Sequence, residues 1–217
     1  FFYSFLVLLY IFLVMFDIPT QYCEQLLQIG WEPINTISNI AFIFAGIFAF
    51  YKIRNEKSVL KFILPILLIL VGVGSSWWHI SHTHYGDIAD TFFILIFASV
   101  VSVLFFRKLL DSWTKVLLSF FVLLGITFFT EQLDCLNGSL PYVVLFVALI
   151  IGSIFYAKKF SSLKPLLITT ITTFGIAIIF RSIDVLVCPS ISFGTHFLWH
   201  ILVAVLGYQL ILLVGRK

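Results

Sequence analysis

The histidines of this chain are spaced in a way that suits a metal site. His196 and His200 are four residues apart, so on a helix they lie on one face, where two imidazoles can bind one ion. His79 lies near the end of a separate apolar segment and can supply a third nitrogen. Three protein ligands with an open fourth position describe a catalytic zinc site. We therefore expect zinc at His79, His196 and His200, with hydrogen bonding between helices as the alternative role of each histidine.

Two further histidines compete with His79 for the third ligand position. His82 and His84 follow it closely, in a short polar stretch with Gly86 between two apolar segments. A loop of this kind favours solvated or interfacial side chains. Both residues stay rival candidates at the level of sequence.

Ser75 and Asp90 flank this polar stretch and carry groups that can act on a substrate. Ser75 is four residues before His79, which places the two on one helical face, and Asp90 follows at the start of the next segment. A carboxylate there can act as a general base, and a hydroxyl can stabilise a developing oxyanion. The alternatives are structural: Asp87 as N-cap with Asp90 in the first turn, and Ser75 as a small residue that permits close helix contact.

A second polar patch covers residues 31–39. Pro33 suits a first helical turn, and the neighbouring Asn35 and Asn39 share a face. A helix start with interhelical hydrogen bonds explains this pattern. Alternatively, Glu32 together with Glu24 is a candidate site for a hard cation such as calcium.

The composition places these residues in a membrane protein. The chain of 217 residues is 61% hydrophobic and 11% charged, with a mean hydropathy of +1.14. This excludes an ordinary soluble domain. A net charge of +3 carried by scattered basic residues does not indicate nucleic-acid binding. Ionisable side chains at membrane depth are costly and usually mark a functional site, which supports the hypothesis of a buried metal centre.

Long apolar runs predict an all-α integral membrane protein in one domain, residues 1–217, with short connections between antiparallel helices. The eight segments are 1–16, 34–51, 59–79, 87–106, 115–130, 140–157, 164–182 and 194–214. The first segment is shorter than the roughly 20 residues that a span needs. A signal-peptide core is the competing interpretation. We expect an additional N-terminal helix there.

The basic residues predict the orientation. If every segment spans, all but Arg181 of the thirteen fall on one side, which by the positive-inside rule is cytoplasmic, as are both termini: Lys52, Arg54, Lys57, Lys61, Arg107, Lys108, Lys115, Lys158, Lys159, Lys164, Arg216 and Lys217. The histidines and the three cysteines then lie at the extracytoplasmic face. Disulfides survive on that side, so one bonded pair and one free thiol are expected.

At these residues the chain resembles the alkaline ceramidases, within the wider membrane-hydrolase superfamily that includes adiponectin-type receptors and GPI-remodelling lipases. The resemblance covers about residues 21–214 and rests on motifs that occur in the family's order: Glu32-x-x-Asn35-x-x-Ser38-Asn39, Ser75-x-x-x-His79, Asp90, Arg181-Ser-Ile-Asp184-x-x-x-Cys188 and His196-x-x-x-His200.

The resemblance implies a seven-helix ceramidase-like bundle over residues 21–214, with residues 1–20 as the extra helix. It also implies zinc at His79, His196 and His200, Ser75 and Asp90 in the catalytic shell, and a disulfide between Cys23 and Cys188 that leaves Cys135 free. Glu24 and Glu32 match calcium ligands of the family. Gln21 and Leu26 replace an expected Asp and Asn, so the calcium site departs from the family pattern.

The resulting hypothesis is a zinc-dependent amidase that cleaves the amide bond of ceramide or a related N-acyl lipid within the bilayer. Asp90 would accept a proton from the attacking water and return it to the leaving amine, while Ser75 stabilises the oxyanion. The alternative is a non-enzymatic membrane receptor or transporter with a structural metal site.

Overall fold

The computed structural model describes residues 22–27, 30–55, 59–133 and 135–215, and within these ranges the regular structure is helical. The elements in chain order are η1 (Gln25–Leu27), α2 (Pro33–Ser38), α3 (Ile40–Ile53), α4 (Val59–Ser81), α5 (His84–Leu109), α6 (Trp113–Glu131), α7 (Leu140–Lys159), η2 (Ser161–Leu163), α8 (Lys164–Val187) and α9 (His196–Gly215).

The described residues contain seven helical segments that are long and apolar enough to cross a membrane. They are Pro33–Ile53, Phe62–Ser81, His84–Leu109, Trp113–Glu131, Leu140–Lys159, Ser161–Val187 and His196–Gly215. The first combines α2 and α3, which meet at Asn39 with helical backbone angles. Seven of the eight predicted segments are thereby confirmed. The predicted helix at 1–16 lies outside the described residues.

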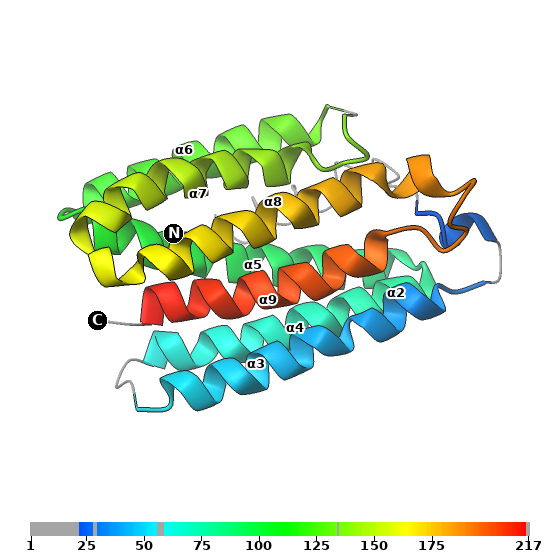
Figure 1. The fold of residues 1–217 in the computed structure, drawn as a ribbon, viewed down its shortest axis with the longest axis horizontal. Coiled ribbons are helices and arrows are strands. Elements are labelled where there is room, and N and C mark those ends of the chain that lie inside the picture. The colour runs from blue at the N-terminus through cyan, green and yellow to red at the C-terminus, as the bar shows by residue number, and fades with distance from the viewer. Residues whose placement is uncertain (1–21, 28–29, 56–58, 134, 216–217) are drawn as a thin grey trace.

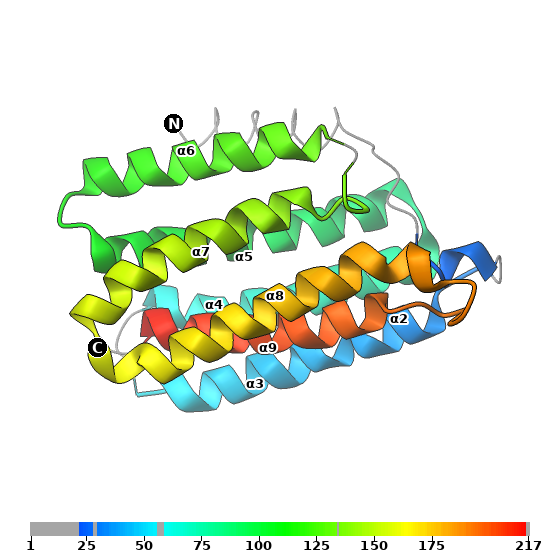
Figure 2. The ribbon, with the colours of Figure 1, turned by 45° about the horizontal axis from the view of Figure 1, so that its top comes forward.

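The helices run roughly parallel to one long axis (Figure 1). The last helix, α9, occupies the interior of the bundle and packs against α8, α3 and α4, while α4 packs along α5. Helix α6 lies at one edge (Figure 2), where its main neighbours are α5 and α7. This arrangement surrounds α9, which carries two of the histidines, with other helices.

Small residues allow the central helices to approach closely, as is common in membrane bundles. A Cβ at Gly46 of α3 would come within 2.8 Å of the Pro65 carbonyl oxygen of α4, and a Cβ at Gly74 of α4 would come within 2.8 Å of the Ala89 carbonyl oxygen of α5. The second contact brings the end of α4 directly against the start of α5. These are the helix ends that carry Ser75 and Asp90.

At the opposite end, Tyr156 of α7 is fully buried and donates a hydrogen bond to the Leu213 carbonyl oxygen of α9 at 2.6 Å. Its ring stacks on Phe105 of α5, with the centroids 5.2 Å apart. These contacts therefore connect α5, α7 and α9 at the end of the bundle far from the histidines. A disulfide stabilises the end that contains the histidines.

The predicted disulfide is present between Cys23 and Cys188, with a Cα–Cα distance of 5.4 Å. It joins the segment before α2 to the end of α8, across 165 residues of sequence. Cys135 is exposed and forms no disulfide within the described part of the chain. The bond lies at the same end of the bundle as the start of α9.

Candidate metal centre and lipid cavity

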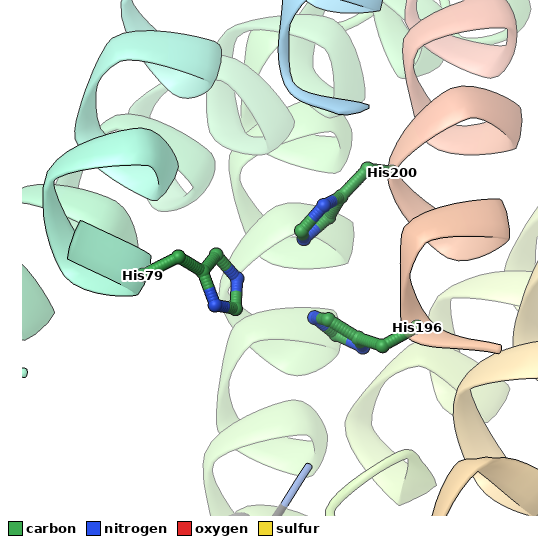
Figure 3. A group of neighbouring side chains, drawn as sticks. All are labelled: His79, His196 and His200. Atoms are coloured by element: carbon green, nitrogen blue, oxygen red, sulfur yellow. The ribbon is translucent and has the colours of Figure 1, made fainter. Parts of the chain in front are cut away.

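Three histidine rings converge between the end of α4 and the start of α9 (Figure 3). The ring centroids of His196 and His200 are 4.5 Å apart, and those of His79 are 5.4 and 4.9 Å from them. One nitrogen from each ring lies within 4.8 Å of the others, and all three side chains are buried. This group can hold a metal ion. Three imidazole nitrogens form a donor set that suits zinc.

His79 is oriented by Glu32, which is fully buried at the start of α2. The Nδ1 of His79 lies 2.9 Å from Glu32 Oε2, and that oxygen also accepts a 2.6 Å hydrogen bond from Asn35 Nδ2. The Glu32 backbone N–H donates in turn to the His79 carbonyl oxygen at 2.9 Å. Because a carboxylate accepts, His79 donates from Nδ1 and leaves its Nε2 lone pair free for a metal. A carboxylate partner of this kind is typical of metal-binding histidines.

His200 is held in the same way by α2. Its Nδ1 lies 3.1 Å from the Asn35 carbonyl oxygen and 2.8 Å from the Ser38 hydroxyl oxygen. The Ser38 hydroxyl donates its own proton to the Asn35 carbonyl at 2.7 Å, so its oxygen accepts from His200. The Nε2 of His200 is therefore also free to bind a metal.

His196 is fixed by stacking. The Tyr22 ring lies on it with a centroid separation of 3.9 Å. The His196 Nδ1 is buried and has no hydrogen-bond partner among the described residues. An orphaned buried nitrogen beside two oriented imidazoles fits a site that a metal ion completes.

The start of α9 is built around Asp184. Its Oδ1 accepts the backbone N–H groups of Thr195 at 2.5 Å and His196 at 2.8 Å, and its Oδ2 accepts that of Cys23 at 2.9 Å. Gly194 has a φ of +66°, and a Cβ there would collide with Asp184 and Cys23. A glycine is therefore required in the turn that delivers His196 to the site. In the sequence Asp184 belongs to the motif that ends at Cys188, and its pattern alone predicts no role for it.

The rival histidines lie outside the triad. His84 is exposed, and His82 packs edge-on against Trp78. The Nε2 of His82 is 3.5 Å from Glu32 Oε1, so His82 contacts the partner of His79 and is not itself in the group of three. Of the three candidates for the third ligand position, His79 is the one that lies beside His196 and His200.

Ser75 and Asp90 face one another across the α4–α5 contact, and their side chains interact by a hydrogen bond. Helix α5 begins at His84, with Thr83 as its N-cap and the Thr83 hydroxyl accepting from the Gly86 N–H at 3.3 Å. The alternative of Asp87 as the N-cap is therefore wrong. Asp90 lies in the second turn, too far from the helix start to serve as a cap, and one of its oxygens is buried without a partner among the described residues.

Glu24 has a structural use. Its two carboxylate oxygens accept the backbone N–H groups of Ile34 and Asn35, each at 2.8 Å, which caps the start of α2. Burial raises the pKa of Glu24 and raises the pKa of Glu32 to about 6. Within the described residues, no third histidine, cysteine or carboxylate joins these two in a metal-binding group.

A cavity of about 360 Å³ opens beside the triad and is lined by Ser75, Asp90, His196 and His200 at its polar end. Its remaining walls are mostly apolar and follow α9 from His196 to Leu210. At 1.5 Å per residue, this length is about 21 Å. The cavity is therefore long and apolar enough for a lipid chain, with polar groups at one end, as in other ligand sites.

The family model described as Ceramidase matches residues 19–215. A comparison with curated proteins found no match.

Proposed function

Because the chain belongs to the Ceramidase family, we propose that it is a zinc-dependent membrane hydrolase that cleaves the amide bond of ceramide or a related N-acyl lipid. One observation carries the proposal: three buried histidines can hold a metal, and two of them, His196 and His200, line the polar end of a long apolar cavity. The family suggests hydrolysis of ceramide.

In this proposal His79, His196 and His200 hold the ion. The hydrogen bonds to His79 and His200 support these ligands, because Glu32 and the Asn35 carbonyl accept from the two Nδ1 atoms and fix the ring orientations. When bound, zinc supplies Lewis acidity that activates water at neutral pH. The protein supplies the fixed ligand geometry and a site enclosed by helices.

Asp90 is proposed as the general base and acid. It lines the cavity beside His196 and His200 and carries a buried oxygen with no partner among the described residues. It would accept a proton from the attacking water and return it to the leaving amine. Before the reaction Ser75 would donate its hydroxyl proton to the Asp90 carboxylate and hold it in place. Once Asp90 has taken the proton from water, it can donate to the Ser75 oxygen, and the Ser75 hydroxyl proton is then free to turn to the oxyanion that develops on the substrate carbonyl.

The acyl chain is proposed to lie along α9. The cavity wall contains Val203, Leu206 and Leu210 on that helix, and Phe105 and Phe106 on α5. A chain in this position would leave its amide at the polar end, near the histidines. The end of the bundle with the basic residues would face the cytoplasm and the site would lie near the extracytoplasmic face.

A calcium ion at Glu24 and Glu32 stays a weaker proposal. Both carboxylates are buried, and lone pairs remain on their oxygens beyond the hydrogen bonds described above. Gln21 lies outside the described residues, and the side chain of Leu26 carries no oxygen. The zinc proposal does not depend on this ion.

The test is hydrolysis of a radiolabelled N-acyl sphingosine by the purified full-length protein, compared with Asp90→Asn. The wild type should release fatty acid. The variant should keep its metal and lose rate by roughly 10²–10⁴-fold, as expected for a lost acid–base group. Metal-loaded wild type without amidase activity would instead support a receptor or transporter with a structural metal, and an Asp90→Asn variant at the parent rate would refute the assigned role.

A further inference from the structure

Arg181 places a guanidinium inside the bundle, close to the histidines. The side chain is 6% exposed, belongs to α8 and lines the cavity. Its Cζ lies 5.2 Å from the ring centroid of Tyr142, 5.4 Å from that of Trp199 and 5.8 Å from that of Tyr22. Since Tyr22 stacks on His196, a single ring separates the guanidinium from the proposed metal site. A charge at this depth is costly, so its presence needs a reason.

The protein leaves most of this guanidinium without a hydrogen-bonding partner. The aromatic rings interact with its positive charge, but they do not accept its in-plane N–H groups in the way that an oxygen does. Among the described residues its hydrogen bonding consists of one long contact, from Nη1 to the Tyr22 hydroxyl at 3.5 Å, and its buried Nε has none. A buried donor without a partner is rare in folded proteins and calls for an explanation.

The nearby carboxylates do not fill this need. Asp184, one helical turn further on, uses both oxygens for the backbone N–H groups at the start of α9 and next to the disulfide. Asp90 interacts with Arg181 electrostatically, yet no ion pair joins Arg181 to a carboxylate in the described ranges. The guanidinium is thus available to a group that enters the cavity.

From this geometry we propose that Arg181 is a binding subsite for a carboxylate carried by the lipid in the cavity. The planar fork of an arginine matches a carboxylate with two parallel hydrogen bonds. A singly charged group is favoured over a phosphate, because Asp87, Asp90 and Glu131 line the same cavity and repel a larger negative charge.

The carboxylate can come from two sources. It is either the carboxylate of the fatty acid that hydrolysis releases, or a carboxylate on the amine half of the substrate, as in an N-acyl amino acid. In both cases the acyl chain occupies the apolar part of the cavity. The second source rests on the proposed amidase function, whereas binding of a fatty acid does not require catalysis.

The first experiment measures ligand binding. Thermal unfolding of the full-length protein is followed against increasing dodecanoic acid or dodecanol, which share one chain and differ in the carboxylate. In the wild type, half-maximal stabilisation should need roughly tenfold less acid than alcohol, the low end expected for charged hydrogen bonds. Arg181→Gln should abolish this preference and leave dodecanol binding unchanged, which also shows that the cavity is intact.

Arg181→Lys serves if the glutamine variant does not fold. Lysine keeps the positive charge but lacks the planar guanidinium that gives two parallel hydrogen bonds, so this variant should bind dodecanoic acid more weakly and dodecanol unchanged. An acid preference as large as that of the wild type in either variant would overturn the proposal, since another group, such as the metal, would then bind the carboxylate.

The second experiment separates the two sources with N-dodecanoyl glycine and N-dodecanoyl ethanolamine. If the carboxylate belongs to the amine half, Arg181→Gln should lower kcat/KM for the glycine amide about tenfold and spare the ethanolamide. If the carboxylate belongs to the fatty acid product, Arg181→Gln should weaken inhibition by dodecanoic acid about tenfold. Any change in kcat/KM should then be the same for both amides. No dependence on Arg181 in either arm refutes the subsite. A wild type that binds the acid through Arg181 but hydrolyses no amide would refute the proposed function alone.

Discussion

Removing the Glu32 carboxylate is the perturbation that most directly examines how the metal ligands are oriented. Glu32→Ala takes away the acceptor of His79 Nδ1 at 2.9 Å and of Asn35 Nδ2 at 2.6 Å. Loss of the hydrogen-bond partner of a metal-binding histidine typically costs about 10–100-fold in metal affinity, which corresponds to about 1.4–2.7 kcal/mol. Two buried donors also lose their partner, at about 1–3 kcal/mol each, so the free energy of unfolding should fall by about 2–6 kcal/mol.

Glu32→Gln is the graded variant. Its amide oxygen can still accept from His79 at the Oε2 position, and the amide nitrogen would occupy the Oε1 position, where the carboxylate oxygen has no hydrogen bond among the described residues. The zinc affinity should therefore fall less than in the alanine variant, by about tenfold or less. Glu131→Gln makes the same chemical change in a cavity-lining residue outside the histidine group and should leave the zinc affinity unchanged.

The assay is competition for zinc between each purified variant and a series of chelators, with bound zinc measured by mass spectrometry and folding followed by thermal unfolding. The expected order of affinity is wild type and Glu131→Gln, then Glu32→Gln, then Glu32→Ala. If folded Glu32→Ala holds zinc as tightly as the wild type, the carboxylate does not orient His79 and the reasoning fails.

Three further predictions concern the surroundings of the site. Asp184→Asn places an N–H-bearing amide where both carboxylate oxygens accept backbone N–H groups, so thermal stability and zinc content should both fall; a variant equal to wild type in both would contradict the role of Asp184. Calcium should raise the melting temperature if Glu24 and Glu32 bind it, and this shift should vanish in Glu24→Gln; no shift in the wild type removes the calcium proposal. An accessibility tag within residues 160–163, between α7 and α8, should be reached only from the cytoplasmic side; labelling from the other side would reverse the proposed orientation.

The helices were predictable because their apolar runs are long and their connections short. The predicted start of the segment 87–106 is three residues late: apolar periodicity begins near Ile88, whereas α5 begins at His84 and Thr83 caps it through Gly86. That cap is a local polar contact, which hydropathy does not detect. The same delay produced the incorrect alternative role for Asp87.

The metal group was predictable from spacing, since His196 and His200 share a helical face whatever packs against them. The partners of these histidines were not. Glu32 lies 47 residues before His79 in sequence, and its pattern also suited a cation site, so only the packing of α2 against α4 and α9 reveals its contact. The sequence marks Arg181 as an exception to the charge distribution and as part of a family motif, but it does not predict the surroundings of the side chain, because its aromatic neighbours come from three separate segments of the chain.

The proposed function depends on a zinc ion held by the three converging histidines. Its most direct test is the zinc content per chain of the purified wild type, of His200→Ala and of His84→Ala, a matched change at an exposed histidine. We predict about one zinc per chain in the wild type and in His84→Ala, and almost none in His200→Ala. A wild type that binds no zinc, or a His200→Ala variant that keeps its full complement, would contradict the claim.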